Sequence, residues 1–223
     1  MISVVIPTLN EAAVLDSTLS RLTQQLDGHE LLIVDGGSTD CTRQIARKYG
    51  NVISSGRGRA CQLNAGANAA SGATFLFLHA DVELEPGAVQ AVEAAVAAGY
   101  VGGAFRQRID GAHPLYRIIE FAANLRAKHL KVYYGDGGIF IGRTHFRQIG
   151  GFPDLPIMEE IGFSRELRRL GKTTLVKSCI HISSRRWEQN GIIRTTLINW
   201  LITLLFLFGI SPTRLAKMYR HVR

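Results

Sequence analysis

Residues 75–86, with the sequence FLFLHADVELEP, decide how the rest of the chain is interpreted. The apolar run over residues 75–78 predicts a buried strand, and Asp81 and Glu83 follow where that strand is expected to end. Open α/β sheets bind their ligands beyond the carboxyl ends of the strands. Two carboxylates at such a place are suited to a divalent cation that in turn holds a diphosphate. Taken alone, the same residues also fit a solvated turn that leads into a helix.

Strands and helices alternate through the first 98 residues. We expect strands over residues 2–6, 31–34, 52–54 and 75–78. The spacing of apolar residues, with capping residues at the ends, predicts helices over residues 11–26, from Ser38 or Thr39 to Tyr49, over 60–70 and over 86–98. This alternation predicts a mostly parallel central sheet that is covered by helices on both faces.

After Gly99 the alternation is less regular. The pattern predicts a strand over residues 101–109, a helix over 115–131, a glycine-interrupted strand over 133–141 and a helix over 158–170. We expect residues 1–184 to form one α/β domain. Residues 185–223 are expected to form a separate C-terminal helical segment, because their composition is apolar and basic.

Composition places the chain among globular proteins of the cell interior. Hydrophobic residues make up 46% of its 223 residues, which excludes a disordered protein. Met1 leads directly into an apolar run with no basic segment before it, so we expect no cleavable secretion signal. Cys41, Cys61 and Cys179 show no metal-binding spacing, and we expect free thiols in a reducing, cytoplasmic compartment.

The positive charge is concentrated at the C-terminus. The net charge is +8, and residues 185–223 hold seven Lys and Arg side chains against Glu188 alone. That tail therefore carries +6 and the remaining residues only +2, which argues against nucleic-acid binding. Within the tail, residues 197–210 (LINWLITLLFLFGI) are apolar on nearly every side. We expect the tail to lie on the inner face of the plasma membrane rather than to cross it, with packing on the core or in a homodimer as the alternative.

A cluster of polar residues and glycines follows each of the first four expected strands. These clusters are Pro7-Thr8-Leu9-Asn10-Glu11, then Asp35-Gly36-Gly37-Ser38-Thr39-Asp40, Gly56-Arg57-Gly58-Arg59-Ala60, and Asp81 with Glu83. A parallel sheet gathers such positions along one edge. There Asp35 can accept a hydrogen bond from a base or a ribose hydroxyl, Gly37 lets the backbone approach a ligand, and Arg59 can counter phosphate charge. The third cluster is not a dinucleotide fingerprint, because Cys61 stands where its third glycine would be.

Seven motifs follow one another along the chain: VVIPTLNE, LLIVDGGSTDCT, GRGRACQLNAGANAASG, FLHADV, YGDGGIFIGR, IGGFPDLPIMEE and SRRWEQNG. In this succession the chain resembles the family 2 glycosyltransferases of the GT-A fold over nearly its whole length. The later motifs resemble a small bacterial and archaeal branch, one often labelled as arsenosugar-biosynthesis glycosyltransferases. The resemblance implies the GT-A form of the α/β fold, a nucleotide-sugar donor and a hydroxyl acceptor.

The resemblance implies a donor site in which Pro7, Thr8, Glu11 and Asp35 line the nucleoside pocket, most often for a UDP-sugar. The full set of candidate donor-binding residues is Pro7, Thr8, Asn10, Glu11, Asp35, Gly37, Ser38, Arg59, Asp136, Arg186 and Trp187. In that set Arg59 would lie near the phosphates and Asp136 near the donor sugar or the acceptor. Ser183 stands where processive members of the family carry a glutamine, so we do not expect processive transfer.

The resemblance also implies a metal site that holds Mn²⁺ or Mg²⁺. Asp81 matches the principal aspartate of the family's Asp-x-Asp motif, and Glu83 stands where a second aspartate is usual. Glutamate can still ligate directly or through water. His181 is the candidate third ligand, although a histidine between Ile180 and Ile182 also fits a structural role.

Glu159 and Glu160 match the family's Glu-Asp pair, whose second member is usually the general base, with Glu160 in place of the aspartate. Inverting transfer needs a carboxylate that takes the proton of the acceptor hydroxyl as the hydroxyl oxygen attacks. We therefore expect Glu160 to be the base, with Glu159 as the alternative. Both residues also suit the start of a helix, where negative charge is favoured.

We expect an inverting, metal-dependent glycosyltransferase that moves a sugar from a nucleotide-sugar donor to a hydroxyl acceptor. The apolar, basic tail suggests a lipid-linked acceptor at the cytoplasmic membrane face, while a small soluble acceptor is the alternative. Since Glu83 and Glu160 both depart from the family's pattern, a nucleotide-sugar-binding protein without transferase activity is the second hypothesis. The glutamate pair, followed by Arg186 and Trp187, favours sugar transfer over nucleotidyl transfer.

Overall fold

The computed structural model describes residues 1–220. Its strands are β1 (Ile2–Thr8), β2 (Glu30–Asp35), β3 (Asn51–Ser54), β4 (Thr74–Phe77), β5 (Val82–Leu84), β6 (Gly102–Ile109), β7 (Ile139–Gly142) and β8 (Thr173–Ile182). Its helices are α1 (Ala12–Thr23), α2 (Thr42–Ala46), α3 (Arg59–Ala69), α4 (Ala88–Ala97), α5 (Pro114–His129), α6 (Arg143–Ile149), α7 (Glu159–Leu170), α8 (Arg185–Asn190), α9 (Ile192–Leu207) and α10 (Pro212–Arg220), with one 3-10 turn at Gly135–Gly137.

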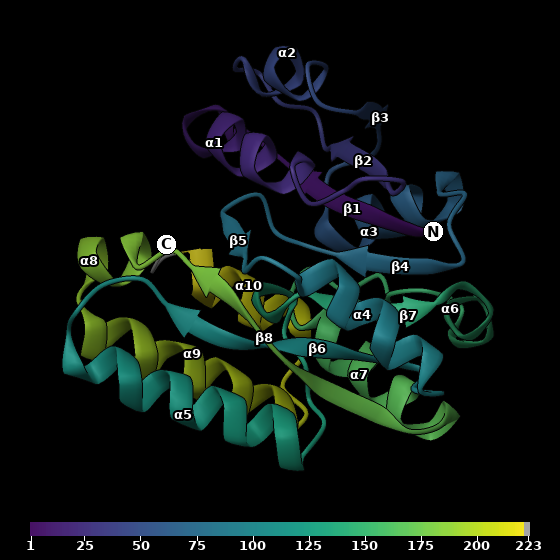
Figure 1. The fold of residues 1–223 in the computed structure, drawn as a ribbon. Coiled ribbons are helices and arrows are strands. Elements are labelled where there is room, and N and C mark those ends of the chain that lie inside the picture. Colours follow the sequence, from purple (N-terminus) through teal and green to yellow (C-terminus); the bar gives the residue numbers. More distant parts are fainter. Residues whose placement is uncertain (221–223) are drawn as a thin grey trace.

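The strands form one eight-stranded sheet in the order β3-β2-β1-β4-β7-β6-β8-β5 (Figure 1). The first four strands in this order pair in parallel. β7 is antiparallel to both β4 and β6, β6 and β8 are parallel, and β5 closes the sheet antiparallel to β8. The carboxyl ends of β3, β2, β1 and β4 therefore meet at one edge, as the sequence predicts.

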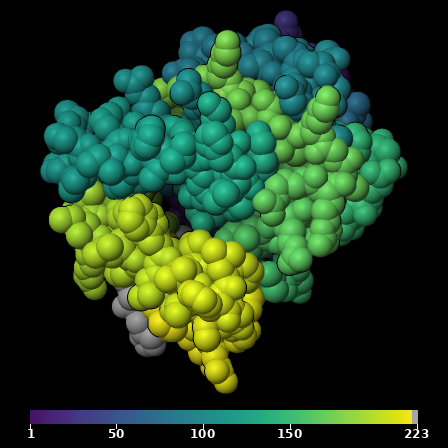
Figure 2. Space-filling view, turned by 90° about the horizontal axis from the view of Figure 1, so that it is seen from below, coloured from purple at the N-terminus to yellow at the C-terminus, as the bar shows by residue number. Residues whose placement is uncertain are grey.

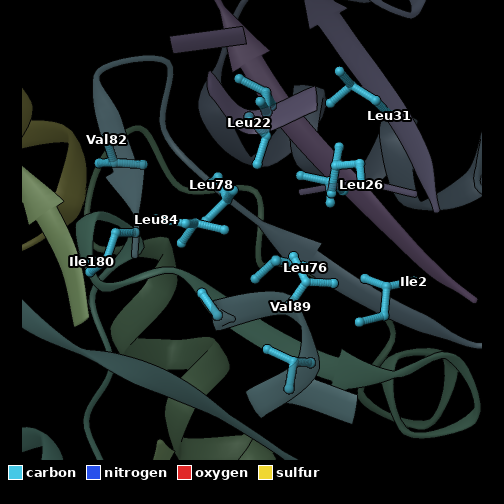
Figure 3. Close-up of a cluster of buried hydrophobic side chains, with 14 of the residues drawn as sticks. Ile2, Leu22, Leu26, Leu31, Leu76, Leu78, Val82, Leu84, Val89 and Ile180 are labelled. Carbon is cyan, nitrogen blue, oxygen red and sulfur yellow. The ribbon is translucent and has the colours of Figure 1, made fainter. Parts of the chain in front are cut away.

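Side chains of β1 alternate between two hydrophobic cores, one on each face of the sheet. Ile2, Val4 and Ile6 point into the core that α1, α2 and α4 cover. Val5 points into the core under α3, α6 and α7. Figure 3 shows the first of these cores, where side chains from α1, α4, β4 and β5 converge. Helices on both faces of a mostly parallel sheet confirm the predicted α/β architecture.

Several segments differ from the sequence prediction. The strand expected over residues 133–141 begins only at Ile139, because the chain first forms the 3-10 turn and then passes Gly138 with a φ of +61°. A β-carbon on Gly138 would lie 2.8 Å from the ring of Phe105, so packing against β6 sets this bend. The sequence pattern also does not predict β8, whose buried positions do not alternate.

The helix expected to begin at Ser38 or Thr39 is shorter than predicted and begins at Thr42. Asp40 rather than Ser38 or Thr39 provides the capping interaction, since its Oδ1 accepts the Thr42 N–H at 2.9 Å. Ser38 and Thr39 instead bond to Asn10 in the neighbouring loop. Ser38 and Thr39 therefore join the loops after β1 and β2 instead of capping the helix that follows them.

The C-terminal helices α8, α9 and α10 follow Arg185, and α9 runs beside α5 at the bottom of the molecule in Figure 1. None of the helices within residues 1–220 combines the length and the apolar character that a bilayer crossing requires. Arg223, which the sequence analysis counts in the basic tail, lies outside the described residues. The division into domains of residues 1–184 and 185–223 stays a prediction.

Gly66 offers a test of how tightly α3 packs on the sheet. Replacing a glycine inside a helix with alanine usually stabilises a protein by about 0.5–1 kcal/mol. A β-carbon on Gly66 would lie 2.3 Å from Val5 Cγ1 and 2.9 Å from Val34 Cγ2. We therefore expect Gly66→Ala to lower the free energy of unfolding in urea by about 1–3 kcal/mol. The exposed control Asn68→Ala on the same helix should not lower it, and a stabilised Gly66→Ala would contradict this packing.

Candidate functional site

A buried glutamine joins the ends of β1 and β2. The Nε2 of Gln62 in α3 donates to the carbonyl oxygens of Thr8 and Val34, each at 2.8 Å. A β-carbon on Gly36 would lie 2.9 Å from the end of the Gln62 side chain, so a larger residue in this turn would displace the Gln62 amide. The sequence analysis did not single out Gln62. A polar residue on the sheet-facing side of a predicted helix was the available signal.

The loops after β1 and β2 are bonded to each other, which brings together several predicted donor-binding residues. The Asn10 N–H donates to Ser38 Oγ and the Thr39 N–H donates to Asn10 Oδ1, both at 2.9 Å. Asn10 adopts a φ of +55°, a conformation that asparagine tolerates better than most residues. The Glu11 N–H donates to Thr42 Oγ1 at 2.8 Å, which fixes the start of α1.

Asp35 lies at the floor of these two loops and is only 1% exposed. Its carboxylate accepts the N–H groups of Gly37 and Ser38, with nearest distances of 3.1 Å each. Gly37 has a φ of +93°, which glycine alone adopts without strain. Thr8 pairs with Asp35 in the parallel register, and the half-buried Pro7 precedes it. The predicted nucleoside pocket residues therefore share one edge of the sheet.

A second cluster forms where α3 and α7 begin. The guanidinium Nη1 of Arg59 lies 3.3 Å from Glu160 Oε1 and 3.7 Å from Glu159 Oε1. Glu159 and Glu160 are the first two residues of α7, and they are 2% and 7% exposed. The N-terminus of a helix favours negative charge, but two adjacent buried carboxylates also repel each other. Arg59 thus faces these carboxylates.

The repulsion between the carboxylates of Glu159 and Glu160 affects the pKa of Glu159. Burial, together with the charge of Glu160, raises the pKa of Glu159 to about 7, against the opposing effect of Arg59. At neutral pH Glu159 is therefore protonated in a large share of molecules. Burial disfavours the charged guanidinium, yet the carboxylates of Glu160 and Glu159 raise the pKa of Arg59 above its ordinary value.

Asp136 lies in the 3-10 turn beside this cluster. The Nε2 of Gln107 in β6 donates to Asp136 Oδ1 at 2.6 Å. Burial raises the pKa of Asp136 above its ordinary value, with the charge of Arg126 opposing and that of Glu160 adding to the shift. Gln107 and Arg126 are functional candidates that the sequence analysis missed, because nothing in their local sequence relates them to a turn many residues away.

Gly135 lies against this cluster and leaves no room for a side chain. A β-carbon at this position would lie 2.6 Å from both Glu160 Oε1 and His79 Nε2. His79 thus lies near Glu160, although the sequence analysis passed over it in favour of Asp81. The structure therefore brings five titratable residues around one turn: Arg59, His79, Asp136, Glu159 and Glu160.

Two of the three predicted metal ligands, Glu83 and His181, are opposite each other in the pairing of β5 with β8, but each contacts another charged side chain. Glu83 is exposed on β5 and forms an ion pair with Arg21 of α1. His181 on β8 lies between Asp110, at 3.1 Å, and Glu85, at 3.6 Å. The alternation of β5 places Val82 and Leu84 in the core and so turns the intervening Glu83 outward. Within residues 1–220 there is no group of three or more His, Cys, Asp or Glu residues that is placed to hold a metal ion.

Asp81 nevertheless has the properties of a single metal ligand. It is half-buried in the turn between β4 and β5, and no hydrogen bond or ion pair within the described residues engages its carboxylate. Mg²⁺ in nucleotide sites is commonly held by one or two carboxylates, with waters and substrate phosphates completing its coordination. One unengaged carboxylate at this edge fits that form of binding.

Arg186 and Trp187 are not brought to the cluster. Arg186 Nη1 donates to the Tyr219 hydroxyl at 3.0 Å, and Trp187 Nε1 donates to Thr196 Oγ1 at 3.2 Å. The Trp187 ring also meets the edge of Tyr116, with 6.1 Å between the centroids. Both side chains hold the C-terminal helices together, so a donor contact by Arg186 would require it to exchange its partner Tyr219.

The chain is similar to known proteins in sequence and in fold. The family described as Glycosyl transferase family 2 matches residues 3–152. Validoxylamine A glucosyltransferase of Streptomyces hygroscopicus subsp. jinggangensis (strain 5008) is 40% identical over 106 residues, which are 43% of this chain. The match spans only 25% of that relative's length.

Two solved structures share the fold. The mannosyltransferase PcManGT from Pyrobaculum calidifontis, in complex with GDP-Man and Mn²⁺, has a TM-score of 0.66 and 18% identity over 99% of this chain and 69% of its own. The glucosyl-3-phosphoglycerate synthase from Mycobacterium tuberculosis, in complex with Mn²⁺, UDP and glucosyl-3-phosphoglycerate, has a TM-score of 0.59 and 23% identity over 82% of this chain and 70% of its own. This chain therefore has the GT-A fold.

The raised pKa of Glu159 predicts a pH dependence of stability. The folded protein holds a proton on Glu159 between its ordinary value of 4.5 and about 7, where the unfolded chain has lost it. Stability should therefore fall as pH rises through this window, by a total on the order of 3 kcal/mol for this group. We expect Glu159→Gln to lose that slope in urea unfolding measured from pH 4.5 to 8. Glu166→Gln, a control farther along α7 whose side chain is 44% exposed, should keep it. An unchanged slope in Glu159→Gln would contradict the shift.

Proposed function

Because the chain belongs to glycosyl transferase family 2, we propose that it transfers a sugar from a nucleoside diphosphate donor to an acceptor hydroxyl, with inversion at the anomeric carbon. The observation that carries the proposal is the buried pair of Glu159 and Glu160, held by Arg59 at the edge of the sheet where nucleotide-binding loops end. The bound GDP-Man and UDP of the two structural neighbours support a nucleotide-sugar donor. We favour a UDP-sugar.

The donor's nucleoside would lie against the loops after β1 and β2. Thr8 and Asp35 end adjacent strands there, and Asn10 and Ser38 bond the loops to each other. This pre-formed edge lowers the entropy lost when a nucleotide binds. The diphosphate and sugar would then extend toward Asp81 and toward Asp136 in the 3-10 turn.

Glu160 is the group we assign as general base. Its Oε1 lies close to Gly135 of the 3-10 turn, and Glu160 is 7% exposed, whereas Glu159 is 2% exposed. Glu160 would take the proton of the acceptor hydroxyl as the hydroxyl oxygen forms a bond to C1 of the sugar. The bond between C1 and the diphosphate oxygen breaks on the opposite side, and the nucleoside diphosphate leaves. Arg59 holds Glu160 in position for this transfer.

We assign Asp81 as the ligand of a divalent cation. Mn²⁺ or Mg²⁺ bound there would offset the charge that develops on the leaving diphosphate. The Mn²⁺ in both neighbouring structures supports this assignment. Glu83 and His181 would join the ion only after giving up their contacts with Arg21 and with Asp110 and Glu85.

The acceptor and the location of the enzyme form the finer part of the proposal. The apolar, basic C-terminal helices favour an acceptor presented at the cytoplasmic face of a membrane, with the enzyme bound peripherally. A small soluble acceptor, with the C-terminal helices in a homodimer contact, is the alternative. Vesicle binding, described in the next subsection, separates the two.

Glu160→Gln should abolish most of the transfer without affecting donor binding. The amide cannot accept the hydroxyl proton, so we expect kcat to fall about a hundredfold or more while the donor Kd stays the same. Glu166→Gln on the same helix is the matched control and should keep full activity. Magnetic resonance of the product would report the anomeric configuration, and retention of configuration would contradict the inverting mechanism.

Asp81→Asn tests the metal assignment. A panel of nucleotide sugars should bind wild-type protein, with one donor favoured and binding strengthened by Mn²⁺. In Asp81→Asn we expect the Mn²⁺-dependent gain in affinity to disappear, by about tenfold or more, because the amide removes the ligand charge. Thermal unfolding would confirm that the variant is folded. If no nucleotide sugar binds the folded wild-type protein, the transferase proposal fails; donor binding without transfer would favour the binding-protein alternative.

A further inference from the structure

The outer faces of α5 and α9 each expose a stripe of apolar side chains. On α5 the stripe consists of Ile118, Phe121 and Leu125, with exposed fractions of 60%, 69% and 47%. On α9 and directly after it, the exposed apolar side chains are Ile193, Leu197, Trp200, Leu201, Leu204, Leu207 and Phe208. Most neighbours in each stripe are three or four residues apart, which places them on one side of each helix. We call these two stripes together the apolar face.

The two helices lie on the same side of the molecule. They run beside each other at the bottom of Figure 1, and Figure 2, seen from below, shows α5 in teal next to the C-terminal helices in yellow. Side chains join the two segments: Trp187 of α8 meets Tyr116 of α5. The hydroxyl of Tyr134, whose ring lies under Arg126 of α5, is 3.2 Å from Thr203 Oγ1 of α9. An exposed apolar surface that extends over two helices on one side of a protein is typical of an interaction site.

The charge carried by the same helices indicates what covers the apolar face. Lys128 of α5, Arg194 of α9, and Arg214 and Lys217 of α10 are exposed cations. The acidic residues of these helices and of α8 are Glu120 and Glu188. Glu120 is held by Arg117 at 2.8 Å and by the Ile109 N–H, and Glu188 is held by Ser184. The apolar face is thus accompanied by positive charge that the neighbouring carboxylates do not balance.

We propose that the apolar face of α5 and α9 lies in the interface of an anionic lipid membrane, with both helices parallel to the bilayer plane. Apolar side chains would enter the acyl boundary while the cations meet lipid phosphates. A second copy of this chain is a poorer partner, because it would bring the same positive charge to both sides of the contact. The sequence pattern suggested membrane contact for the tail alone; α5 lies about 70 residues earlier and supplies the other half of the surface.

The apolar face is joined directly to the proposed catalytic cluster, and this step rests on the proposed function. Tyr134 is contacted by Arg126 of α5 and Thr203 of α9, and it immediately precedes the turn that holds Gly135 and Asp136. A protein seated on this face would therefore hold the turn close to the lipid surface. The inferred acceptor is a hydroxyl on the head of a lipid whose chains stay in the bilayer, so that only the head reaches Glu160.

Flotation with vesicles tests the membrane surface without donor, acceptor or turnover. The probes are vesicles of phosphatidylcholine with phosphatidylglycerol, and vesicles of phosphatidylcholine alone. We expect full-length protein to float with the anionic vesicles and to be released by high salt. The double variant Phe121→Glu with Leu125→Glu should lower the partition coefficient about tenfold or more, because α9 alone would remain in contact. Leu197→Glu with Leu204→Glu on α9 should have a similar effect.

The control carries the same added charge elsewhere: Gln90→Glu with Ala94→Glu at exposed positions of α4 should bind vesicles as the wild type does. Circular dichroism and nucleotide-sugar binding should be unchanged in all variants, since none of these residues lies in the proposed site. Undiminished vesicle binding by the α5 variant would overturn the proposal. So would a wild type that ignores anionic vesicles and sediments as a dimer that the α5 substitutions dissociate. Either result would leave the sugar-transfer proposal standing if donor binding is retained.

Discussion

Two adjacent carboxylates buried beside one guanidinium constrain this molecule more than any other contact. Burial opposes ionisation of Glu159, the carboxylate of Glu160 lies beside it, and the cation that pairs with both within the described residues is Arg59. A proton on Glu159 near neutral pH relieves part of that repulsion. Arg59 is the first residue of α3, and Glu159 and Glu160 are the first two residues of α7. The attraction between these charges therefore also determines how the starts of the two helices face each other.

The same cluster connects the two halves of the sheet. Arg59 comes from a helix of the parallel half, and His79 follows the last strand of that half. Asp136 comes from the turn before the antiparallel strand β7, and Gln107 of β6 holds it in place. Behind the turn, Tyr134 is contacted by α5 and α9, which carry the apolar face. Glu160, which we propose as the general base, and the surface that we assign to lipid are therefore separated by one short segment of chain.

The parallel half of the fold could be predicted from the sequence, and most of the other half could not. Strands β1 to β4 and the helices between them show local apolar periodicity and end in recognisable turn residues. The chain instead bends at Gly138 because Phe105 leaves no room there for a side chain. The buried residues of β8 do not alternate, so its local sequence lacks the pattern that predicts a strand. The spacing of Asp81 and Glu83 predicts a shared metal, which stays a prediction. The sequence did not show that Glu83 lies opposite His181 in the sheet and contacts Arg21.

By itself, the sequence determined the family, the parallel strands and the residue types at their carboxyl ends, because these depend on periodicity and on side chains that are neighbours along the chain. Only the tertiary structure decided which of them meet. In the folded protein, Arg59 contacts glutamates a hundred residues away, and Gln62 donates hydrogen bonds to the ends of two strands. The apolar stripe of α5 also lies beside that of α9. Such contacts depend on how the helices pack on the sheet and on which side chains the whole fold can bury. A local sequence pattern contains no information about either.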